Sequence, residues 1–303
     1  MEGKLSDCLG YLSVGDENDH DGSPVTNVSI VEKLSREQSQ ELIAAARDLY
    51  FFSSGEDLYF CFQKNMEELL SSVLDFAERY FEAGGMTDEN MASASFEFSR
   101  LMLNLLGMFK SFLDHGEAAL KRKYGVSSAQ ATAWKQVQSI EYDKSIAYRL
   151  FYNLRNYAQH VGMPPMHFSL DHNAAGDGVV VRLDFYKSEL LDTYSKWSKD
   201  ARSDLVNGNE VIPIIPMLDE WSHCFHRMVK HIQGVRMKEV ISSATIISSL
   251  RDSFTIPENG VLILLPEPEV SECGQLSFSF QKIPEKKAND ILAGTFMRKF
   301  EEY

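Results

Sequence analysis

Proline is missing from a long stretch of this chain, and that absence constrains the fold more than any other feature. No proline occurs from Val25 to Met163, and Pro164-Pro165 closes the stretch. Six of the nine prolines in the 303-residue chain follow Pro165. Proline inside a helix removes a hydrogen bond and clashes with the preceding turn. Its absence therefore favours long helices between residues 25 and 163.

Four helices are expected within this stretch. Apolar residues recur at helical spacing in each, and polar capping residues or glycines separate them. Thr87, followed by two acidic residues, predicts a helix start, and Gly125 predicts a helix end. The expected helices run from Ser35 to Phe51, from Glu56 to Ala83, from Thr87 to Tyr124, and from Ser127 or Ser128 to Val161. Short connections between long amphipathic helices predict an antiparallel four-helix bundle.

Glycine and serine predict interruptions of the helical pattern at three places. Ser53-Ser54-Gly55 predicts a break between the first two helices, and His115-Gly116 predicts a break or kink in the third. Gly234 is expected to divide the helical region from Ile214 to Phe254 into two helices. The reason is that serine and glycine are weaker helix formers than alanine or leucine.

The regions on either side of the helical stretch have a different character. Residues 1–30 are rich in Gly, Asp, Asn and Ser and predict a flexible acidic N-terminal arm. Beyond residue 163, short β-prone segments alternate with helical ones up to a final helix at 286–296. The β-prone segments are Val179–Phe185, Val261–Leu265 and Leu276–Phe280. The sequence thus predicts a mainly α protein with an arm at 1–30, a helical bundle at 31–163 and a smaller α+β domain at 164–303.

Composition is that of an ordinary globular chain without a membrane anchor. Hydrophobic residues make up 44% of the sequence, yet no apolar run approaches the roughly 18 residues that span a bilayer. No basic segment followed by an apolar one marks a signal peptide at the N-terminus. The four cysteines are scattered and form no CxxC pair, as is typical of reduced thiols. These features predict a cytoplasmic protein with no membrane partner.

Charge is distributed unevenly along the chain. The net charge of −14 argues against a surface coated with basic residues for nucleic acid. Residues 110–163, however, carry eight basic and four acidic residues. Part of this excess, Lys121-Arg122-Lys123, is typical of a helix C-terminus, where cations complement the helix dipole.

A dense polar cluster lies at the end of the fourth expected helix, between Tyr152 and His160. Asn156 and His160 are four residues apart and share one helix face. Arg155 lies about 100° round the helix from Asn156. The polar side of the helix carries Arg149, Tyr152, Asn153, Asn156 and His160. The apolar side carries Ala147, Leu150, Phe151, Leu154, Tyr157, Ala158 and Val161. A helix with two such sides suits a bundle core on one side and a cleft or symmetric partner on the other.

The residues Arg155-Asn156-x-x-x-His160 resemble the motif of the HEPN superfamily (higher eukaryotes and prokaryotes nucleotide-binding). That motif is an arginine, usually followed by a polar residue, with a histidine after four to six residues, late in the last helix of a four-helix bundle. The resemblance covers about residues 35–163. It implies a metal-independent endoribonuclease without cofactors, acting as a homodimer whose two motif helices meet. It also implies a role in defence or stress-type RNA restriction.

Residue chemistry agrees with RNA cleavage by the RNA's own 2′-hydroxyl. A histidine that titrates near neutrality can accept or donate a proton, so His160 is assigned to proton transfer. A planar guanidinium can clamp the charge that develops on phosphate oxygens, so Arg155 is assigned to phosphate stabilisation. Asn156 is assigned to positioning. Tyr152 is expected to stack on a base and Arg149 to contact the RNA backbone.

Other interpretations of these residues stay open. The same fold and motif also suit a non-catalytic helical protein that binds nucleotide or protein, or an ordinary polar helix surface. HEPN toxins that pair with nucleotidyltransferase antitoxins often carry a tyrosine two residues after the histidine. This chain has Gly162 there, so modification at that tyrosine is not expected. His223 and His226 have the spacing of a possible zinc pair, but no Cys or acidic ligand accompanies them at recognisable spacing, which favours a structural role.

Overall fold

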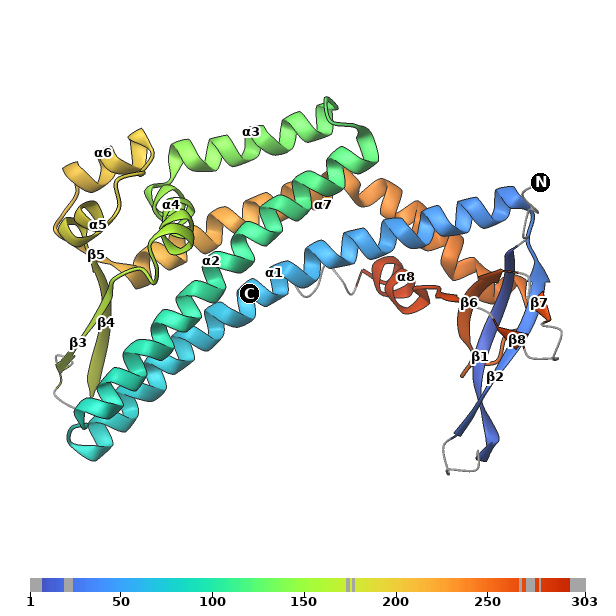
Figure 1. Ribbon diagram of the computed structural model, residues 1–303, viewed down its shortest axis with the longest axis horizontal. Coiled ribbons are helices and arrows are strands. Elements are labelled where there is room, and N and C mark those ends of the chain that lie inside the picture. Colours follow the sequence, from blue (N-terminus) through green and yellow to red (C-terminus); the bar gives the residue numbers. More distant parts are fainter. Residues whose placement is uncertain are drawn as a thin grey trace. The chain divides into compact units, whose positions relative to one another are not determined.

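The computed structural model shows a mainly helical protein with small antiparallel sheets (Figure 1). It describes residues 7–18, 24–172, 175, 178–266, 269–270, 276–277 and 279–294. The chain packs as two compact units: unit 1 comprises Met1–Ser54 and Arg236–Tyr303, and unit 2 comprises Gly55–Val235. Unit 2 is thus an insertion in the sequence of unit 1. This division differs from the expected boundaries after residues 30 and 163.

Two long helices, α1 (Arg36–Ala83) and α7 (Ile214–Ser253), each contribute to both units. The break expected at Ser53-Ser54-Gly55 is wrong, because α1 continues through it. The hydroxyls of Ser53 and Ser54 donate to the main-chain carbonyl of Tyr50, at 3.3 and 2.8 Å, and are satisfied inside the helix. The division expected at Gly234 is also wrong, since α7 runs through it without interruption.

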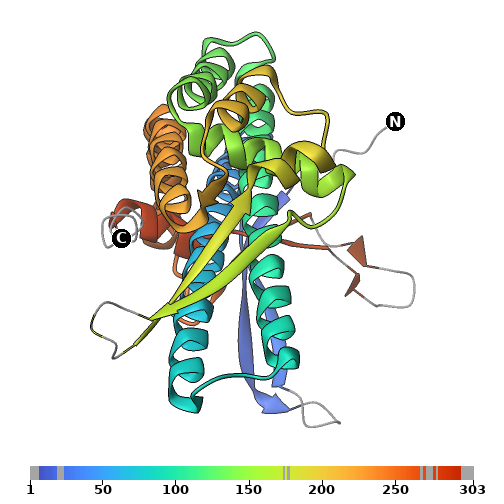
Figure 2. The ribbon, with the colours of Figure 1, turned by 90° about the vertical axis from the view of Figure 1, so that its left-hand side faces the viewer.

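Unit 2 contains the remaining long helices and one sheet. The strands are antiparallel in the order β3-β4-β5, and the hairpin of β3 and β4 crosses the α1–α2 pair (Figure 2). The helix starts at Thr87 and Ser128 and the helix end at Gly125 are confirmed as caps. The elements are α2 (Asp88–Tyr124), α3 (Ala129–Lys144), α4 (Ile146–His160), β3 (Met166–His172), β4 (Val179–Tyr186), α5 (Lys187–Thr193), α6 (Lys199–Asn207) and β5 (Val211–Pro213).

Aromatic side chains from four helices fill the core of unit 2. The Trp221 ring of α7 is packed by Phe62 of α1, Phe109 of α2 and Phe151 of α4. The three ring-centroid distances are 5.0, 5.0 and 4.4 Å. All four side chains are almost completely buried. One of the helices that close this core therefore comes from beyond residue 163, in the region that the sequence assigned to a separate domain.

Gly116 serves close packing and does not interrupt α2. A Cβ at this position would lie 2.9 Å from Ile232 Cδ1 of α7 and 3.0 Å from the Trp134 ring of α3. The helix runs unbroken from Asp88 to Tyr124, so the break expected at His115-Gly116 is wrong. Glycine fits this position because the side chains of Ile232 and Trp134 leave no room for a Cβ.

The fourth expected helix is in fact two helices, α3 and α4, which meet at Ser145. The Ser145 N–H donates to the Glu141 carbonyl at the end of α3, at 3.0 Å. Its Oγ accepts from the Tyr148 N–H at 3.0 Å and so caps the start of α4. The same hydroxyl donates to Glu220 of α7. One serine thus ends one helix and begins the next, which the sequence pattern did not predict.

Unit 1 is built on a four-stranded antiparallel sheet in the order β2-β1-β6-β9. The flexible arm expected at 1–30 is corrected here, since Cys8 and Leu9 are buried within β1 and Cys8 lies opposite Leu265 of β6. Parts of the expected arm (residues 1–6 and 19–23), last strand (residue 278) and last helix (residues 295 and 296) lie outside the described residues. The elements are β1 (Asp7–Asn18), β2 (Pro24–Lys33), β6 (Val261–Pro266), β7 (Glu269–Val270), β8 (Leu276–Ser277), β9 (Gln281–Lys282) and α8 (Glu285–Leu292).

Candidate functional site

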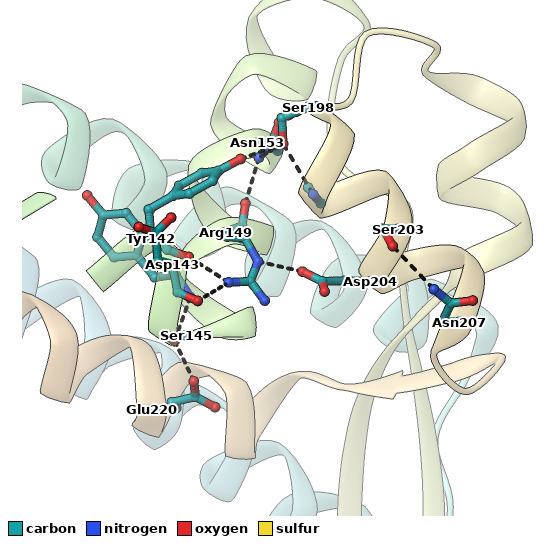
Figure 3. Close-up of polar contacts among 12 residues, drawn as sticks. Tyr142, Asp143, Ser145, Arg149, Asn153, Ser198, Ser203, Asp204, Asn207 and Glu220 are labelled. Atoms are coloured by element: carbon teal, nitrogen blue, oxygen red, sulfur yellow. Dashed lines mark hydrogen bonds and ion pairs between the residues drawn. The ribbon is translucent and has the colours of Figure 1, made fainter. Parts of the chain in front are cut away.

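Arg149, near the start of α4, is bound within the fold (Figure 3). Its Nε donates to Asp204 Oδ2 of α6 at 2.6 Å, and its Nη1 donates to the carbonyls of Tyr142 and Asp143 at 2.6 and 2.8 Å. The side chain is only 11% exposed. The hydrogen bond to Asp204 raises the pKa of the guanidinium. Arg149 therefore satisfies carbonyls at the end of α3 and ties α4 to α6.

Asn153 is also part of the interior, although the sequence placed it on the polar side of the helix. It is 3% exposed. Its Nδ2 donates to the Arg149 carbonyl at 2.8 Å, and its Oδ1 accepts from the Ser198 N–H at 3.1 Å (Figure 3). Ser198 Oγ in turn caps α6 by accepting from the Ala201 N–H at 3.2 Å. Asn153 thus holds the start of α6 against α4.

Tyr157 extends this contact one turn further along α4. Its hydroxyl donates to Thr193 Oγ1 at 2.9 Å, and its ring meets Tyr194 edge-on at 5.5 Å. Residues 193–204 of the same chain therefore cover α4 at Arg149 and Asn153, from its expected polar side, and at Tyr157, from its expected apolar side. This covering segment could not be inferred from the spacing within α4 alone.

Tyr152 lies in a group of tyrosine rings. It stacks with Tyr148 at 6.2 Å between centroids and meets the edge of Tyr142 at 5.9 Å. Its side chain is half-buried. Its ring is therefore already partly engaged within the protein.

Arg155, Asn156 and His160 occupy the part of α4 that this covering leaves accessible. Arg155 Nη1 donates to Asn156 Oδ1 at 3.1 Å, and both side chains are half-buried. His160 is exposed in the last turn. Across the described part of the chain, no carboxylate forms an ion pair with Arg155. Asn156 and His160 share a helix face, whereas Arg155 and His160 are about 140° apart round the helix. One copy of α4 therefore brings Arg155 to Asn156 but does not bring Arg155 and His160 to a single point.

The sequence did not predict a polar cluster in which the exposed Arg227 binds the buried side chains of Glu141 and Cys224. Arg227 of α7 makes two hydrogen bonds to Glu141 of α3, at 2.9 and 2.6 Å, and its Nη2 lies 3.2 Å from Cys224 Sγ. Burial alone would raise the pKa of Glu141, but the bonds from Arg227 lower it. Burial raises the pKa of the Cys224 thiol, which is not a property of a nucleophile. The partners are far apart in sequence, so no local signal could have revealed this cluster.

The histidines of α7 bind different partners. His226 Nδ1 lies 2.9 Å from the Tyr59 hydroxyl, while His223 Nδ1 lies 2.8 Å from the Asp219 carbonyl. Burial raises the pKa of Tyr59 to about 12, and burial lowers the pKa of His226. Within the described ranges, no group of three or more His, Cys, Asp or Glu side chains is arranged to hold a metal ion.

Comparison of the chain with protein-family models, with curated proteins and with solved structures gave no match. Among the described helices, none combines the length and the apolar character needed to cross a bilayer.

Proposed function

We propose that this protein is a metal-independent endoribonuclease of the HEPN type, active as a homodimer. The observation that carries the proposal is the bonding and accessibility of three residues at the end of α4. Arg155 has no carboxylate partner in the described chain, it is bonded to Asn156, and the exposed His160 follows on the same helix. The four helices that share the aromatic core of unit 2 supply the rigid support that such a site needs.

The chemistry is an internal transfer at phosphorus. The imidazole of one His160 takes the proton of the RNA 2′-hydroxyl, whose oxygen then attacks the adjacent phosphorus. The bond from phosphorus to the 5′-oxygen breaks, and an imidazolium returns a proton to that oxygen. The products are a 2′,3′-cyclic phosphate and a 5′-hydroxyl. Arg155 stabilises the negative charge on the non-bridging oxygens, and Asn156 holds the guanidinium in place.

Two copies are needed because one α4 helix does not bring Arg155 and His160 together. Pairing the exposed ends of two α4 helices would place Arg155 of one protomer beside His160 of the other.

Tyr152 keeps its proposed role of stacking on a base, using the part of its ring that is exposed. Arg149 has no part in this site, since its guanidinium is occupied by Asp204 and two carbonyls.

Incubation of the full-length protein with total RNA in EDTA tests this proposal. We expect fragments with cyclic phosphate ends, and a loss of at least about 100-fold in rate for His160→Ala and for Arg155→Ala. His223→Ala is the matched control, because His223 is also an exposed helical histidine, with its side chain 68% exposed. Wild-type protein that leaves RNA intact, or variants that cleave as fast as wild type, would contradict the proposal.

Mixing the two inactive variants tests the composite site separately. A dimer of one Arg155→Ala chain and one His160→Ala chain retains one Arg155 and one His160 from different protomers. We expect such mixed dimers to recover part of the wild-type rate. If wild type cleaves but mixing restores nothing, the two residues act within one chain and the dimer arrangement is wrong. RNA binding without cleavage would favour the second candidate, a non-catalytic binding dimer.

A further inference from the structure

The end of the α1–α2 hairpin projects beyond α4 and the start of α7 (Figures 1 and 2). One side of this projecting end is closed by β3, whose Phe168 ring packs edge-on against Phe76 and Phe98 at 5.5 and 5.6 Å. These contacts complete the hairpin's interior, since Phe76 and Phe98 are almost fully buried. A different side of α1 remains uncovered.

That uncovered side carries a stripe of large apolar side chains, Leu70, Leu74 and Phe81, here called the leucine stripe. Their spacing of four and seven residues places them on one side of the helix. They are 37%, 64% and 43% exposed. Single exposed apolar residues are common, but three in line along one helix are typical of a seam against a second helix.

A row of acidic side chains borders the leucine stripe. Asp75, Glu78 and Glu82 lie three and seven residues apart and share one face of α1, about 40–100° round the helix from the stripe. All three are exposed. In the described parts of the chain, none of the three carboxylates forms an ion pair. The exposed Arg79 lies on the same side, with its Nε donating to the main-chain carbonyl of Asp75 at 3.1 Å, so three carboxylates and one guanidinium leave the surface beside the stripe with a net negative charge.

We propose that the leucine stripe docks a basic amphipathic helix of a partner protein. Its apolar residues would cover Leu70, Leu74 and Phe81, and its lysines or arginines would face the carboxylates of Asp75, Glu78 and Glu82. Charge argues for such a partner over a second copy of this chain, because a second copy would add another acidic row to the same interface. The proposal does not depend on RNA cleavage, since it concerns α1 and not α4.

A binding measurement with defined peptides tests the proposal on the full-length protein. The probe is a fluorescent amphipathic peptide of about 18 residues, with leucines at helical spacing and lysines on one flank. A matched peptide carries glutamates in place of the lysines. We expect the basic peptide to bind at least about tenfold more tightly than the acidic one, with a preference that declines as salt is raised.

Substitutions on α1 connect this binding to the stripe. Leu74→Ser should weaken binding of the basic peptide at least about tenfold, because Leu74 is the most exposed of the three stripe residues. Glu78→Lys combined with Glu82→Lys should reverse the preference toward the acidic peptide. Phe96→Ser is the matched control, since Phe96 is 61% exposed on α2, outside the stripe, and its loss should leave binding unchanged. Circular dichroism checks that each variant is folded.

Three results would overturn the proposal. The first is equal binding of the two peptides by the wild-type protein. The second is binding of the basic peptide that Leu74→Ser leaves unchanged. The third is a homodimer, measured by sedimentation, that Leu74→Ser dissociates, since a second copy would then be the occupant of the stripe.

Discussion

Two arginines of α4 that look equivalent in the sequence have different surroundings. Arg149 is held by Asp204 and by two carbonyls, with little of its side chain exposed, while Arg155 contacts only its neighbour Asn156 among the described polar partners. The difference comes from residues 193–204, which contact α4 at Arg149, Asn153 and Tyr157 and place the Asp204 carboxylate beside Arg149. The polar side predicted for α4 from its sequence therefore contains some residues that bind within the fold and others that stay accessible.

Removing the structural arginine should destabilise unit 2. We expect Arg149→Ala to cost about 3 kcal/mol of unfolding free energy, because Asp204 and two carbonyls would be left without their donor. The control is Arg182→Ala, since the Arg182–Asp171 pair is exposed, at 65% and 50%, and should contribute less than about 1 kcal/mol. Urea denaturation of both variants measures the difference. Equal losses would show that the contacts of Arg149 are not stabilising.

Helix ends were predictable where the capping residue binds main-chain groups close to it in the sequence. Thr87, Ser128 and Gly125 act within three or four residues of their own position, and the structure confirms each as a cap. Ser145 has the same chemistry, but a serine inside a helix-prone segment can equally remain helical, as Ser53 does. Local pattern could not distinguish these two outcomes, because tertiary contacts decide them.

Glycines in α2 offer a direct test of the packing between helices. Gly116→Ala should destabilise the protein by about 1–3 kcal/mol, since its Cβ would press on Ile232 and Trp134. Gly107→Ala is the control in the same helix. It has nothing within 4 Å of its Cβ position, so alanine should be neutral or stabilise by up to about 1 kcal/mol. Thermal unfolding compares them, and a stabilising Gly116→Ala would contradict the close approach.

At the scale of the whole molecule, the helical content was predictable and the partition of the chain was not. The long helices follow from hydrophobic periodicity and the missing prolines. The two units follow from packing between distant segments: Trp221 and Phe225 of α7 enter the core formed by α1, α2 and α4. No feature of residues 31–163 shows that their core is completed from beyond residue 163. Which residues of α4 stay accessible, Arg155 and His160 among them, also depends on contacts with a distant segment, residues 193–204.

The continuous segment 55–235 should therefore fold by itself. We expect a fragment of these residues to be helical by circular dichroism and to unfold cooperatively on heating, because it contains the whole aromatic core of unit 2. The fragment 31–163 is the control, and it should lack a cooperative transition because it has lost Trp221 and Phe225. Cooperative unfolding of 31–163 but not of 55–235 would show that the units are divided wrongly.

The pairing of β1 with β6 has a consequence for biosynthesis. Cys8 lies opposite Leu265, so a ribosome must have made the chain as far as β6 before β1 meets its second neighbour. Unit 2 lies between them in the sequence and can complete its core while β1 still has one open edge. Contacts between such distant residues form slowly, and open strand edges invite association with other chains. The newly made N-terminal strands are thus the part of this protein for which early shielding by a chaperone would matter most.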